Sequence, residues 1–157
     1  MITHDVDERS LPRLVGGSLD EQVNRPKGLI KAPKVYWGDT GVALHLAGLD
    51  APVGAHLENL VLHDLLAWRD ARSDRAELHD LRTTTGEEVD LVLEVAGRHL
   101  PIEIKSTERP RLGDARALRS FRAEYGDVAR SGLLLHTGPH TEWLAPDVLA
   151  VRWWRVV

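Results

Sequence analysis

Hydrophobic and polar residues alternate from Glu88 to Val95, which is the pattern of a β-strand with one polar face. The apolar face of this strand is expected to carry Val89, Leu91, Leu93 and Val95. Asp90 belongs to the other set of positions, so the pattern predicts that its carboxylate points away from Val89 and Leu91.

A second stretch with the same alternation covers residues 99–105. Its apolar positions are Leu100, Ile102 and Ile104. This leaves Glu103 and Lys105 together on the opposite face. Because only residues 96–98 separate the two stretches, we predict that they pair as an antiparallel hairpin.

Two registers of this hairpin are open. A loop at residues 96–97 places Asp90 opposite Glu103, whereas a loop at residues 97–98 places it opposite Lys105. In either register, two carboxylates and one ammonium meet on one face. Carboxylates whose Cβ atoms are roughly 5 Å apart repel each other, and a divalent cation compensates for this better than one lysine does. The alternative is a cluster of surface salt bridges on a solvated sheet face.

A helix is expected from about Ala55 to Arg69, with one broad apolar face. Glu58 falls inside that face, where an unpaired buried carboxylate would cost several kcal/mol. It should therefore meet a cation, a metal or hydrogen-bond donors. Alternatively, it only favours the positive N-terminal end of the helix. Asn59 and His63 fall on the polar side and are interpreted as surface residues.

The other patterns predict further elements on both sides of this core. They are a strand-like run at 34–37, helices near 39–47 and 114–125, and strands at 77–82, 131–138 and 148–156. The order of these elements predicts an α/β fold, with a central mixed β-sheet flanked by helices. In the helix near 114–125, Arg116, Arg119 and Arg122 recur every three residues, either to contact phosphates or as a solvated face.

The amino-acid composition limits which metal ligands and which modes of nucleic-acid binding the chain can use. The 157 residues are 43% hydrophobic and 28% charged, which is typical of a single globular domain. There are no cysteines, so any metal must use oxygen or imidazole ligands. The formal net charge of -4 argues against a protein that coats nucleic acid by bulk charge.

The N-terminal part differs from the rest. Residues 1–32 are polar and irregular, and we interpret them as an arm or as the remnant of a preceding segment; residues 33–157 are expected to form the domain. The chain has no apolar signal-peptide region and no apolar run of about 18 residues. We therefore expect a cytoplasmic protein with no membrane role.

The residues Val89-Asp90 and the segment Ile102–Lys105 (IEIK) resemble the signature of the restriction-endonuclease-like, or PD-(D/E)XK, nuclease superfamily. That fold also places a helix with a glutamate before the first strand, as Glu58 is placed here. The segments PKVYWGDTG, GAHLENLVLHDLL, LRTTTGEEVDLVLE and LPIEIKS resemble a C-terminal domain of unknown function in prokaryotic AAA+-type ATPases, itself similar to these nucleases. The ATPase half and its phosphate loop are absent here, so the chain is interpreted as a truncated member, an excised domain or a stand-alone relative.

The resemblance implies a role for each matching residue. Asp90, Glu103 and the Ile104 carbonyl would bind Mg²⁺ or Mn²⁺. Lys105 would orient the attacking water and offset developing charge, and Glu58 would bind a second ion or take a proton. The implied activity is metal-dependent hydrolysis of phosphodiester bonds in nucleic acid, with DNA expected.

The alternative is a catalytically silent module that binds nucleic acid or a protein partner such as an ATPase. The acidic net charge and the lack of an evident basic strip favour this hypothesis. Glu58, Asp90, Glu103 and Lys105 would then form a structural ion-pair network.

Overall fold

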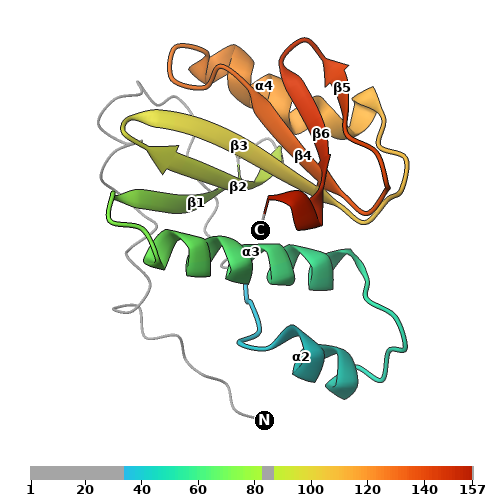
Figure 1. The fold of residues 1–157 in the computed structure, drawn as a ribbon. Coiled ribbons are helices and arrows are strands. Elements are labelled where there is room, and N and C mark those ends of the chain that lie inside the picture. Colours follow the sequence, from blue (N-terminus) through green and yellow to red (C-terminus); the bar gives the residue numbers. More distant parts are fainter. Residues whose placement is uncertain (1–33, 83–86, 157) are drawn as a thin grey trace.

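The fold is a six-stranded mixed sheet with helices on both faces, seen in a computed structural model that describes residues 34–82 and 87–156 (Figure 1). The helices are α2 (Thr40–Leu46), α3 (Gly54–Asp70) and α4 (Arg116–Tyr125), with short 3-10 helices η1 (Leu112–Ala115) and η2 (Trp153–Arg155). The strands are β1 (Ala76–Arg82), β2 (Glu88–Val95), β3 (Arg98–Lys105), β4 (Gly132–His136), β5 (Glu142–Ala145) and β6 (Val148–Arg152). The predicted α/β class is confirmed.

The sheet has two halves of different character. Its strand order is β1-β2-β3-β4-β6-β5, in which β1, β2 and β3 form an antiparallel meander. Strands β3, β4 and β6 are parallel neighbours, and β5 closes the edge antiparallel to β6. The connection from β3 to β4 runs through η1 and α4, which places the end of β3 beside the start of that helix.

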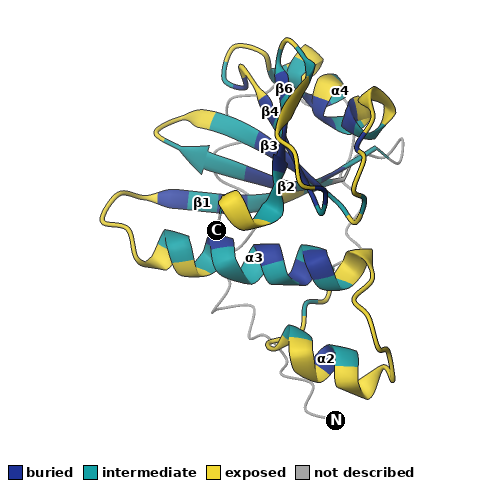
Figure 2. Cartoon of the chain, turned by 45° about the vertical axis from the view of Figure 1, so that its right-hand side comes forward, coloured by how far each residue is buried: buried dark blue, intermediate teal, exposed yellow. Residues whose placement is uncertain are grey.

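Two hydrophobic clusters cover the two faces of the sheet. One packs α3, through Leu57, Val61 and Leu65, against residues such as Leu91 and Ile102. The other packs α4, through Leu118 and Phe121, against the opposite face. Figure 2 shows the buried side of α3 turned towards the sheet, while α2 lies outside and is mostly exposed.

Strand β2 does not have the single apolar face that its alternation predicts. His79 pairs with Val92 and Leu81 with Val89, so one residue of β1 faces two residues of β2, Asp90 and Leu91. This β-bulge reverses the alternation at that point. Val89 therefore joins Val92 in the cluster on the α4 side, while Leu91 belongs to the cluster on the α3 side. The prediction that Val89 and Leu91 share a face was wrong.

Local signals located most of the other elements. The predicted helix at 55–69 is α3. The helix predicted near 39–47 is α2, and Asp39 caps its N-terminus, because its Oδ1 accepts a 2.8 Å hydrogen bond from the Val42 amide. The run at 34–37 is not a strand, and the last strand ends at Arg152 rather than near Val156. The expected arm at 1–32 lies outside the described residues. None of the helices in the described parts of the chain is long and apolar enough to cross a membrane.

Candidate functional site

The β2–β3 hairpin adopts the first of the two predicted registers. Its loop residues Ala96 and Gly97 have φ values of 51° and 71°, as a two-residue turn of this type requires, and Val95 pairs with Arg98. Regular pairing continues to Leu91 and Ile102. At the bulge, the side chain of Asp90 replaces a backbone acceptor, because its Oδ2 accepts a 2.8 Å hydrogen bond from the Ile104 amide. This bond fixes Asp90 beside β3.

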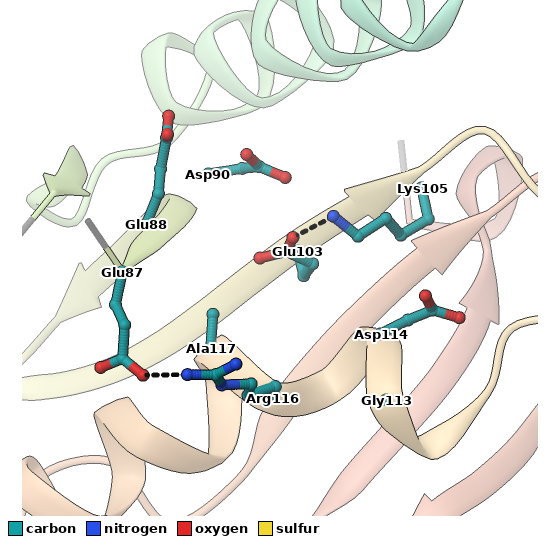
Figure 3. Close-up of a pocket in the computed structure, with 9 residues that line it drawn as sticks. All are labelled: Glu87, Glu88, Asp90, Glu103, Lys105, Gly113, Asp114, Arg116 and Ala117. Atoms are coloured by element: carbon teal, nitrogen blue, oxygen red, sulfur yellow. Dashed lines mark ion pairs between the residues drawn. The ribbon is translucent and has the colours of Figure 1, made fainter. Parts of the chain in front are cut away.

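A pocket of about 470 Å³ opens where the hairpin faces η1 and the start of α4. It is lined by Glu87, Glu88, Asp90, Glu103, Lys105, Gly113, Asp114, Arg116 and Ala117. Figure 3 shows Glu103 and Lys105 projecting from β3 towards this space, with Asp90 beside them on β2. The hairpin thus brings together three of the residues that the sequence pointed to.

Glu103 is the most strongly perturbed carboxylate of the pocket. The residue is 5% exposed, and its Oε1 lies 2.5 Å from the Lys105 Nζ. Its other oxygen, Oε2, is buried and has no hydrogen-bond partner among the described residues. Burial, followed by the nearby charge of Asp90, raises the pKa of Glu103 to about 7, although Lys105 acts in the opposite direction.

Asp90 is in a more balanced environment. Burial raises its pKa, and the charge of Glu58 adds to this effect. The Ile104 amide and the ammonium groups of Lys34 and Lys105 act against it. The net shift is still upward, so the surroundings leave the charged form of Asp90 less stable than it is in water.

Glu58 reaches this cluster through a residue that the sequence analysis missed. Its Oε1 lies 3.0 Å from the Lys34 Nζ and accepts a 2.9 Å hydrogen bond from the Tyr36 hydroxyl. The same ammonium lies 2.6 Å from Glu88 and 3.5 Å from Asp90. Lys34 therefore links the carboxylate of α3 to the two carboxylates of β2.

Asn59 holds the segment that carries Lys34, and its assignment to the surface was wrong. The residue is 4% exposed, and its side chain bonds both the amide and the carbonyl of Trp37, at 2.8 and 3.1 Å. His63 also contacts that carbonyl, at 2.6 Å. The signal for this arrangement is weak in the sequence. Lys34 and Tyr36 alternate with Val35, which is 86% exposed, but the neighbouring sequence does not indicate which residues they contact.

Residues 53–155 match the family described as Domain of unknown function (DUF4143). The chain belongs to the DUF4143 family. Among its relatives are the uncharacterized proteins Rv2008c of Mycobacterium tuberculosis and Mb2031c of Mycobacterium bovis, each 32% identical over 130 residues. The alignment covers 77% of this chain but 27% of each relative, so the chain spans about a quarter of their length. No solved structure matches it.

Within this DUF4143 domain, the three predicted arginines have different surroundings. Arg116 lies at the rim of the pocket with its side chain 82% exposed, 3.7 Å from Glu87. Arg119 is exposed as well. Arg122 instead pairs with Asp147 and donates a 3.2 Å hydrogen bond to the Ala129 carbonyl. Arg116 and Arg119 are therefore open to a ligand, whereas Arg122 holds two loops to α4.

Metal-binding capacity in the described parts of the DUF4143 domain depends on few side chains. No group of three His, Cys, Asp or Glu residues there is placed to hold an ion by itself. Asp90 and Glu103 supply two carboxylates to the pocket, whereas Ile104 is not among its lining residues and contacts Asp90 through its amide. Any ion there would have to complete its shell with a carbonyl, water or substrate.

Proposed function

We propose that this domain is a metal-dependent nuclease that hydrolyses phosphodiester bonds, and we expect its substrate to be DNA. We also propose that its fold is of the restriction-endonuclease-like type. One observation carries the proposal. Glu103, with a buried oxygen that has no partner among the described residues, lines an open pocket together with Asp90 and Lys105. Burying a carboxylate oxygen without a donor is costly, and a hard cation entering from the pocket removes that cost.

The donor atoms of the pocket suit Mg²⁺ or Mn²⁺. Mg²⁺ prefers oxygen ligands and is commonly held by one or two carboxylates, with waters and substrate phosphates completing the shell. Asp90 and Glu103 would hold the ion, together with the Ile104 carbonyl that the resemblance implies. A bound ion would polarise a phosphoryl oxygen and lower the pKa of a water molecule.

The basic residues of the pocket would act on the substrate. Lys105, held against Glu103, would orient the attacking water and offset the charge that develops on the phosphoryl group. Arg116 at the rim and Arg119 further along α4 would contact phosphates of the nucleic-acid backbone. These contacts would position the strand without reading its sequence.

A different observation favours the non-catalytic alternative. Lys34 already contacts three carboxylates, so part of the local charge is balanced within the chain. In this alternative the cluster is structural, and the domain binds nucleic acid or a protein partner. The relatives are longer than the aligned segment, which leaves room in them for a further domain such as the ATPase that the resemblance implies.

Nuclease assays with single variants test the proposal. With Mg²⁺ or Mn²⁺, the purified chain should nick or degrade DNA, and EDTA should stop the reaction. Lys105→Ala should lower the rate by about 10²-fold or more while metal binding persists, because this ammonium acts on the transition state. Asp90→Ala should lose both activity and metal binding.

Arg75→Ala is a suitable control, because that side chain is 89% exposed in a surface ion pair with Glu77. It should leave the rate unchanged. Two results together overturn the nuclease proposal. DNA and RNA of several forms stay intact, even when the assay is repeated with any ATPase encoded beside the chain, and Lys105→Ala changes only the stability of the protein. That result would favour the binding module.

A further inference from the structure

Lys34 is enclosed by acidic side chains in a way that a surface lysine is not. Its Nζ lies 2.6 Å from Glu88, 3.0 Å from Glu58 and 3.5 Å from Asp90, and its side chain is 21% exposed. An ammonium has three N–H donors, and here three carboxylates surround it. The group therefore lies where carboxylates from α3 and β2 converge.

Contacts along the neighbouring backbone fix this position. Asn59 bonds the amide and the carbonyl of Trp37, and His63 contacts the same carbonyl. Between these contacts and Lys34, the Tyr36 hydroxyl donates to Glu58. These contacts hold residues 34–37 to α3. The conformational entropy that is lost when the Lys34 backbone is fixed is therefore already lost on folding.

The charge of Lys34 persists at neutral pH. An ordinary lysine side chain is protonated at neutral pH, and the carboxylates of Glu88, Glu58 and Asp90 around Nζ favour this charged form. The ammonium is thus a permanent positive charge between these carboxylates.

We propose that Lys34 is a built-in cation that takes the place of a second metal ion, so that the site binds one divalent ion, on the Asp90 and Glu103 side. This inference rests on the proposed metal centre. Mg²⁺ binds carboxylate oxygens at about 2.0–2.1 Å. An ion on the same oxygens of Glu58 and Glu88 would collide with the Lys34 ammonium and be repelled by it.

The inference narrows the role of Glu58. The resemblance allows Glu58 to bind a second ion or to take a proton. In the structure its Oε1 instead accepts from both Lys34 and Tyr36, which makes Glu58 the residue that positions the built-in cation.

Binding stoichiometry distinguishes these roles without any assay of activity. Titration calorimetry with Mn²⁺ should give one ion per chain for the parent and two for Lys34→Met. Mn²⁺ should also raise the melting temperature of Lys34→Met by about 5 °C more than that of the parent, since a second site binds only the native state. Arg75→Met, which removes a cation from a surface pair, should match the parent.

A second variant keeps the test decisive if Lys34→Met does not fold without metal. Glu58→Gln should leave the number of bound ions at one, because Glu58 holds Lys34 and not an ion. Loss of an ion in Glu58→Gln, or one ion in both the parent and a folded Lys34→Met, overturns the inference while the metal centre stands. No ion in the parent but one in Lys34→Met would show that Lys34 excludes an ion, but it overturns the proposed metal centre and, with it, the one-ion site inferred here. No ion in either overturns both.

Discussion

Glu103 shows how a single side chain sets the chemistry of the pocket. One oxygen is paired with Lys105, while the other is buried without a partner among the described residues. Its pKa is raised to about 7 from the ordinary 4.5, chiefly by burial. Near neutral pH this carboxyl is therefore poised between its two protonation states, and a small change of local charge decides which one is present.

The pH dependence of stability should reveal this group. Between about pH 4.5 and 7, the folded chain keeps the Glu103 proton and the unfolded chain has lost it, so the free energy of unfolding falls as pH rises. The loss should approach roughly 3 kcal/mol and level off above pH 7. Urea unfolding across this range, in EDTA, should show the slope for the parent and a smaller one for Glu103→Gln. Equal slopes would show that Glu103 titrates normally.

At the level of elements, α3 has two roles. One side of it forms the core beneath the sheet, through Leu57, Val61 and Leu65. Two adjacent residues, Glu58 and Asn59, hold residues 34–37, one through the Lys34 and Tyr36 side chains and the other through the backbone of Trp37. The helix therefore fixes where the charged cluster lies relative to the hydrophobic core.

Asn59→Ala should release residues 34–37 without changing any charge. The variant loses side-chain bonds to Trp37 and Thr40 and leaves their polar groups without this partner, so the free energy of unfolding should fall by about 2 kcal/mol. Urea unfolding followed by fluorescence measures this loss. His63→Ala, which removes a single contact with the Trp37 carbonyl, should cost less. An Asn59→Ala variant as stable as the parent would show that the segment is not held by this amide.

At the scale of the whole molecule, the pocket lies where the β2–β3 hairpin faces η1 and the start of α4. Asp90 bonds Lys34, on the α3 side, while the pocket it shares with Glu103 is bordered by η1 and the start of α4. The parallel crossover brings η1 to the end of β3, so residues distant in the sequence line one space. A cation there would connect both halves of the fold.

Mg²⁺ or Mn²⁺ should therefore raise the melting temperature of the parent, as any ligand that binds only the native state does. Asp90→Asn should abolish this rise, because it removes a charged ligand. Its amide oxygen can still accept from the Ile104 amide, and less repulsion with Glu103 should make the metal-free variant at least as stable as the metal-free parent. Differential scanning fluorimetry measures both effects. Identical melting curves of the parent with and without metal would favour the structural network.

Several elements of this protein follow from interactions between residues that are close in the sequence. The alternation of β3, the two-residue turn at Ala96-Gly97 and the start of α2 depend on residues a few positions apart. The alternation and a helix near 39–47 were predicted, and the turn is one of the two registers that the sequence left open. Because a hairpin register fixes which side chains meet, the approach of Asp90 to Glu103 and Lys105 followed as well.

Only the tertiary structure decided the rest. The bulge that moves Val89 to the α4 face depends on how β1 pairs with β2, and the burial of Asn59 depends on a segment 22 residues away in the chain. Lys34 meets Asp90 across 56 positions of sequence. Such contacts are selected by the packing of whole elements, and the periodicity of a single element carries no information about its partner.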